Sequence, residues 1–142
     1  MTIEIGMTGN RDGLSPEQRR IFESLLANDM QNVFGQQISF HHGDCVGSDA
    51  DTHHIAKSMG AFVIVHPPEN PTLRAYCEGH ATRVEKGYFA RNRDIVNESL
   101  KMYGFPSHKN EKKGGTWYTI KYSVSQHVPV TIIYSDGSVE QR

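Results

Sequence analysis

The sequence predicts an α/β fold, in which a mainly parallel sheet of about five strands is flanked by helices. Three observations support this prediction. Short apolar runs alternate with segments of helical periodicity, the order typical of βαβ units. The runs at 61–65 and 130–133 are apolar without interruption, as in strands that are buried on both faces. Glycine-bearing turns at 7–13, 42–49 and 113–116 come just before predicted helices. In open parallel sheets, the turns that lead from strands to helices lie at the carboxyl ends of the strands, where ligands bind.

The first half of the chain gives two strands and two helices. Residues 3–7 are a short apolar strand. The next helix begins at Ser15, an N-cap serine, with Pro16 at the first helical position. Residues 37–41 are the second strand, and residues 48–59 are a helix that ends at a glycine.

The second half continues the alternation. Residues 61–65 are the third strand, which two prolines close, and residues 69–87 are expected to be loop and irregular helix. The remaining elements are a helix at 88–99, a weak strand at 100–105, a helix at 116–126 and a β-branched strand at 128–134.

Composition indicates one globular domain over residues 1–142, with 37% hydrophobic and 22% charged residues. No apolar run approaches the roughly 20 residues of a membrane span, and the first residues lack the features of a signal peptide. Cys45 and Cys77 make no disulfide framework, so we expect a cytoplasmic protein without membrane partners. The net charge of −1 argues against broad binding to nucleic acid.

Four motifs occur in a fixed order: TGNRD at 8–12, HGDCVGSDA at 42–50, ARNRDIV at 90–96 and GGTW at 114–117. With these motifs, nearly the whole chain resembles the SLOG superfamily of Rossmann-like domains, named from the DprA and Lonely Guy proteins, and above all its YspA-like branch. The resemblance implies a ligand such as a nucleoside phosphate or an ADP-ribose-like molecule, and a homodimer or higher homo-oligomer. Some members of the superfamily cleave nucleotide N-glycosidic bonds, some sense signalling nucleotides, and some bind single-stranded DNA.

One departure from the family bears on catalysis. Lonely Guy enzymes carry a Gly-Gly-x-Gly-Thr-x-x-Glu motif, whose glutamate supports departure of the base. Gly115 and Thr116 match the Gly-Thr pair, but the glutamate position falls on Thr119, a neutral hydroxyl. If the protein is an enzyme, we expect Asp44 or Asp49 to supply the carboxylate, although both could instead cap a helix.

The glycine turns also predict the ligand-binding residues. Phosphate is expected at the N-terminus of the helix after Gly115, with Arg91, which matches a family arginine, as its clamp. The alternatives are an Arg91 paired with Asp94 on the surface, and a Trp117 that packs instead of stacking on a base. The residues expected to bind the ligand are Gly9, Arg11, His42, Gly43, Gly47, Arg91, Asn92, Gly114, Gly115, Thr116 and Trp117.

Histidines and aspartates gather at 41–54, and Asp49 and His53 share a helix face, but their spacing matches no known zinc pattern. We therefore expect no metal ligands and no cofactor. Cys45 near a helix N-terminus could be a nucleophile, yet a small residue in a tight turn is the simpler interpretation. Three functions remain open: a nucleotide sensor or sequestering protein, which the loss of the glutamate favours, a nucleotide N-glycosidase, and a single-stranded DNA-binding protein.

Overall fold

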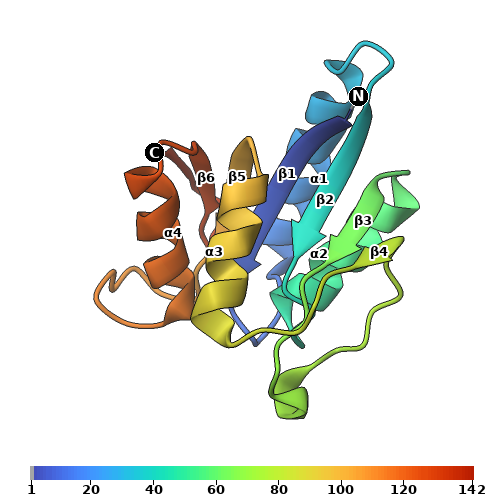
Figure 1. Cartoon of the computed structure of the whole chain (residues 1–142). Coiled ribbons are helices and arrows are strands. Elements are labelled where there is room, and N and C mark those ends of the chain that lie inside the picture. The colour runs from blue at the N-terminus through green and yellow to red at the C-terminus, as the bar shows by residue number, and fades with distance from the viewer. Residues whose placement is uncertain (1) are drawn as a thin grey trace.

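Seven strands form one sheet in the order β4-β3-β2-β1-β5-β6-β7 (Figure 1). The structure, a computed structural model, describes residues 2–142. The strands are β1 (Thr2–Gly9), β2 (Gln37–His42), β3 (Phe62–Val65), β4 (Ala81–Thr82), β5 (Lys101–Phe105), β6 (Val130–Ile133) and β7 (Val139–Gln141). The helices are α1 (Pro16–Gln31), α2 (Ser48–Ser58), α3 (Tyr88–Glu98) and α4 (Gly115–Ser125), with a 3₁₀ turn η1 at Pro71–Leu73.

The predicted fold class is confirmed, and the sheet is larger than expected. Every neighbouring pair of strands is parallel except β6 and β7, which are antiparallel. The expected five strands are all present, and β4 and β7 extend the sheet at its two edges. Both are short and lack an apolar run, so periodicity did not distinguish them from loops. The segment 69–87 is loop with one 3₁₀ turn, as expected, apart from the two residues of β4.

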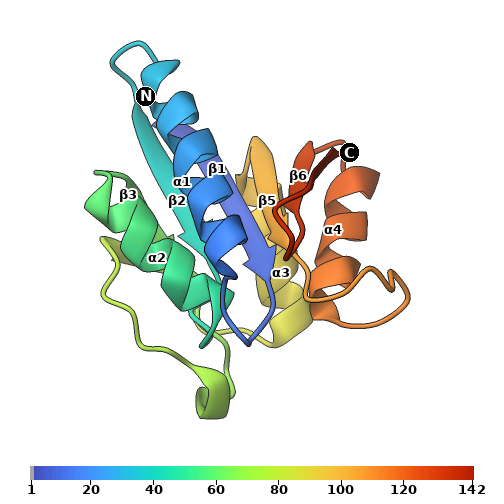
Figure 2. The ribbon, with the colours of Figure 1, turned by 180° about the vertical axis from the view of Figure 1, so that it is seen from behind.

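Helices cover both faces of the sheet. Helices α3 and α4 lie on one face (Figure 1), and α1 and α2 lie on the other (Figure 2). On the α1 side, Phe22 contacts the rings of Phe40, Tyr103 and Phe105 at centroid distances of 5.3–5.7 Å. On the α4 side, the buried residues are Ile95, Val96, Met102, Trp117, Ile120, Val130 and Ile132.

The predicted start of α1 shows how local sequence fixes an element. The Ser15 side chain accepts the main-chain N–H of Gln18, 3.0 Å away, and the Gln18 side chain accepts the N–H of Ser15 in return. Gln18 also donates to the carbonyl of Ile133 at 2.9 Å. The capping box therefore fixes the helix and also joins it to β6.

Strand order decides where a ligand can bind. From β1 the chain adds β2, β3 and β4 in one direction, then returns to place β5 on the other side of β1. The topology thus switches direction between β1 and β5. In open parallel sheets, the crevice beyond the carboxyl ends of such a strand pair is the usual ligand site.

Candidate functional site

A cavity of about 410 Å³ lies at this switch point. The loops after β1, β2 and β5 form its walls together with the first turns of α3 and α4. Ten of the thirteen residues named from the sequence line it: Gly9, Arg11, Gly43, Asp49, Arg91, Asn92, Gly114, Gly115, Thr116 and Trp117.

The other three predicted residues, His42, Asp44 and Gly47, do not line the cavity. The buried His42 ring lies 2.9 Å from His53, and burial lowers its pKa well below the usual value. Asp44 accepts hydrogen bonds from the Arg74 side chain and the Cys77 main chain, both at 2.8 Å, and so anchors the 69–87 segment.

Gly47 has a conformational role next to the cavity. Its φ of +95° lies in the left-handed region, and an added Cβ would overlap the main chain of Arg11. Gly47 thus allows the loops after β1 and β2 to touch. Of the five glycines expected to bind the ligand, four line the cavity and Gly47 supports it from outside.

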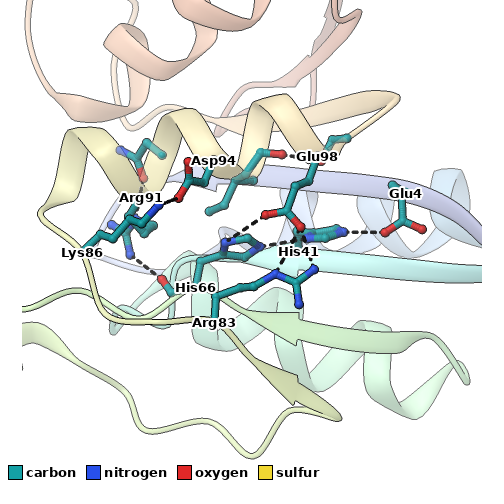
Figure 3. Close-up of polar contacts among 11 residues, drawn as sticks. Glu4, His41, His66, Arg83, Lys86, Arg91, Asp94 and Glu98 are labelled. Carbon is teal, nitrogen blue, oxygen red and sulfur yellow. Dashed lines mark hydrogen bonds and ion pairs between the residues drawn. The ribbon is translucent and has the colours of Figure 1, made fainter.

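Arg91 is a buried residue that binds main-chain carbonyls just beyond the carboxyl ends of β2 and β3. It lies in the first turn of α3 and is only 5% exposed. Its Nη1 donates to the carbonyl of His66 at 3.2 Å (Figure 3) and to the carbonyl of Gly43, and its Nε donates to Asn92 at 2.7 Å. The alternative of a surface pair with Asp94 is wrong, because Asp94 pairs with Lys86 at 2.5 Å. The guanidinium therefore ties the ends of β2 and β3 to α3 and also lines the cavity.

Asp49 is the carboxylate that the fold buries in the cavity wall. It lies in the first turn of α2, and its Oδ2 accepts the main-chain N–H of Cys45 at 3.1 Å. Burial raises the pKa of Asp49 to about 6, although the nearby Arg91 lowers it in part. A group with such a pKa can give or take a proton near neutral pH.

From the sequence, the simpler interpretation of the neighbouring Cys45 is a small residue in a tight turn, and the alternative is a nucleophile. Cys45 also lines the cavity, but burial and the charge of Asp49 raise the pKa of the thiol. The nearby Arg91 guanidinium offsets this rise only in part. The arrangement favours a packing role for Cys45 over a nucleophilic one.

Two helix N-termini open onto the cavity. Neither α3 nor α4 has a side-chain cap or an acidic residue in its first turn. Gly114 has a φ of +98°, and an added Cβ at Gly115 would meet no atom within 4 Å, so the first turn of α4 faces open space. Arg11 and Lys113 add positive charge around the same space. Uncapped N–H groups with cationic neighbours suit an anion.

Three aromatic residues, Tyr88, Phe89 and Trp117, line the cavity, and Trp117 and Tyr88 differ in their environments. Trp117 is 1% exposed and donates its indole N–H to the carbonyl of His108 at 2.8 Å, so it packs α4 and leaves no free ring face. Tyr88 was not predicted from the sequence. Its hydroxyl is buried and has no hydrogen-bond partner among the described residues, and Arg11 and Arg91 each lie 5.5 Å from its ring centre.

The fold defines the chain as a Rossmann-like α/β protein. The X-ray structure of TM1055, a Northeast Structural Genomics Consortium target, has a similar fold, with a TM-score of 0.61, a coverage of 90% of this chain and 72% of that chain, and 14% identical residues. No family model and no curated protein matches the chain. Within residues 2–142, no helix combines the length and the apolar character that a membrane span requires.

Proposed function

We propose that the protein binds a nucleotide or nucleotide-derived anion in the cavity between β1 and β5, as a sensor or sequestering protein. The observation that supports this most strongly is the meeting of two uncapped helix N-termini with the side chains of Arg11, Arg91 and Lys113. The phosphate would lie at the first turn of α4. The Rossmann-like fold and the motif resemblance support assignment to the SLOG superfamily and its YspA-like branch.

Arg11 gives the cleanest test of binding. Its side chain is exposed and makes no hydrogen bond or ion pair with residues 2–142, in contrast to the buried Arg91. We expect R11A to weaken binding by about 1.5–3 kcal/mol, the usual range for a charged hydrogen bond, without a change in Tm. The matched control is R93A, because Arg93 bonds to Tyr118 and does not line the cavity.

The experiment is a calorimetric titration with nucleoside monophosphates, diphosphates, cyclic nucleotides and ADP-ribose. Selective loss of affinity in R11A supports the proposal. Equal affinity in wild type, R11A and R93A for the tightest ligand, or no binding of any member, would refute it.

The second candidate is a nucleotide N-glycosidase, and Asp49 is the observation that favours it. Of the two aspartates named from the sequence, only Asp49 lines the cavity, and a fixed carboxylate would stabilise the positive charge that develops on the sugar. The same titration samples are analysed for free base by chromatography. Base release that D49N abolishes supports the enzyme, and tight binding without release supports the sensor.

We also propose a cytoplasmic homo-oligomer, most simply a twofold dimer. Phe89 and Tyr118 form an exposed aromatic pair across α3 and α4, with ring centres 4.6 Å apart. Single-stranded DNA is the weakest candidate ligand, because the net charge is −1.

A further inference from the structure

A second polar cluster, whose residues do not line the cavity, lies next to the Arg91 contact with His66 (Figure 3). Two buried histidines form its centre: His41 in β2 is fully buried and His66, just after β3, is 2% exposed. Nδ1 of His41 lies 2.9 Å from Nε2 of His66. Glu4 of β1 and Glu98 of α3 lie at either end of the pair.

We propose that His41, His66 and Glu98 form a binding site for a divalent transition-metal ion such as Zn²⁺. One ligand atom from each of the three residues lies within 4.8 Å of the other two. Two imidazole nitrogens and one carboxylate oxygen are a ligand set that Zn²⁺ accepts, and a fourth position stays open for water. The metal would join β2, the end of β3 and α3.

The hydrogen bonds around His41 orient it as a ligand. Glu4 Oε1 lies 2.8 Å from His41 Nε2 and can only accept, so Nε2 carries the proton. His41 Nδ1 therefore presents a lone pair to the centre of the cluster. A carboxylate behind a histidine is the usual outer partner of a metal-binding imidazole.

The other end of the pair shows why a cation would be stabilised there. With the lone pair of His41 facing it, His66 Nε2 must donate, which leaves His66 Nδ1 as an acceptor. Its neighbour, Glu98 Oε2 at 3.9 Å, is also an acceptor. A metal ion bound to His41 Nδ1, His66 Nε2 and Glu98 Oε2 would leave the His66 proton on Nδ1 and would itself lie against the carboxylate.

The charges around the two histidines and the exposure of Glu98 and Arg83 are also compatible with a bound metal ion. Arg83 donates both its hydrogen bonds to Glu98 Oε1, at 3.2 and 2.7 Å, and thereby orients the carboxylate while leaving Oε2 toward His66. The carboxylates of Glu4 and Glu98 lie at the two ends of the imidazole pair and favour a bound cation. The side chains of Glu98 and Arg83 are 35% and 45% exposed, so an ion can reach the cluster from solvent there.

The chain contains its own matched control. His42 and His53 are a second buried pair with the same 2.9 Å separation, and Cys77 lies close to both. However, His42 Nδ1 accepts the main-chain N–H of Asp44 at 3.0 Å, so its proton is on Nε2, the nitrogen that faces His53. His42 thus has no free lone pair for a metal, and we expect no binding at this pair.

The test is titration of chelator-treated protein with Co²⁺, followed by absorption, and with Zn²⁺, followed by calorimetry. We expect one ion per chain, visible bands of low-symmetry Co²⁺ and no near-ultraviolet thiolate band. E98Q alters a partly exposed ligand and should weaken binding by more than the 10–100-fold that loss of an outer partner costs, while E4Q should fall within that range. H66Q should abolish binding, and H42Q and H53Q should leave it unchanged.

Three results would overturn the proposal: no stoichiometric binding, equal affinity in wild type and E98Q, or a thiolate band that H53Q removes, which would place the ion at Cys77. Because H66Q alters the core, its fold is checked by circular dichroism. E98Q decides the outcome if H66Q does not fold.

Discussion

Replacing Asp49 by asparagine removes the buried carboxylate and keeps an oxygen that can accept the N–H of Cys45. In the folded protein the pKa of Asp49 is about 6, compared with 3.8 for the free carboxyl. Above pH 6 both the folded and the unfolded chain carry the charge, and the folded chain holds it without full solvation. The gap between the two pKa values corresponds to about 3 kcal/mol of lost stability at high pH.

The direction in which stability changes with pH follows from proton binding. Between pH 3.8 and about 6 the folded state keeps a proton that the unfolded state has lost, so stability falls as pH rises. At pH 5 about half of the loss has occurred, and at pH 8 all of it has. The gain in unfolding free energy of D49N over wild type should therefore be about 1.5 kcal/mol larger at pH 8 than at pH 5.

Urea unfolding at the two pH values, followed by the fluorescence of the single tryptophan, measures this difference. The control is D12N, which removes an exposed carboxylate that lines the same cavity. If the advantage of D49N is equal at pH 5 and pH 8, the burial of a charged Asp49 has no energetic consequence and the reasoning fails.

The remaining predictions concern the cavity and its supports. R91A should lower the free energy of unfolding by about 2–4 kcal/mol, because two buried carbonyls lose their donor. A thermal melt of R91A with the same Tm as wild type would contradict this. G47A should lower Tm by more than G60A, a control with a similar φ of +94° but open space around the added Cβ. Affinity for a cyclic nucleotide, whose phosphodiester does not titrate near pH 6, should fall as Asp49 ionises and should stay constant in D49N. F89E should convert the proposed dimer to a monomer in light scattering, and a wild-type monomer at micromolar concentration would refute the dimer.

Periodicity predicted most of the fold because buried strands and amphipathic helices leave strong patterns. The run at 61–65 is apolar since β3 lies between layers, and Ser15 and Pro16 mark the start of α1 by their caps. The edge strands β4 and β7 carry no such pattern. They form because the main chain of β3 and of β6 offers free hydrogen-bonding groups, a tertiary cause that is invisible in a short polar segment.

The candidate site could be predicted where position along the chain decided it. Glycine turns after strands correctly indicated one edge of the sheet, since parallel strands bring their carboxyl ends together. Sequence could not decide which way a side chain points. Asp44 and Asp49 bracket the same turn, yet Asp44 has a φ of +55° and turns toward Arg74, while Asp49 faces the cavity.

Histidine spacing could not indicate the proposed metal site for a related reason. His41, His66 and Glu98 lie in three separate elements, so no local motif connects them, whereas the conspicuous cluster at 41–54 contains residues that point to different layers. The pairing of β2 with β3 is what brings two of these residues together. His41 and Ile64 are register partners in β2 and β3, and His66 lies two residues beyond Ile64.

Arg91 explains why the two proposed sites are adjacent without being one site. Its guanidinium binds the carbonyl of Gly43, next to the cavity, and the carbonyl of His66, whose ring belongs to the histidine cluster. A buried cation can bind two main-chain oxygens at the price of its own hydration, so its position is determined by the strand ends rather than by a ligand. An anion that reaches Arg91 would meet a charge that is already fixed in place. The exposed cations of the cavity are Arg11 and Lys113, and their side chains would have to become ordered when the ligand binds.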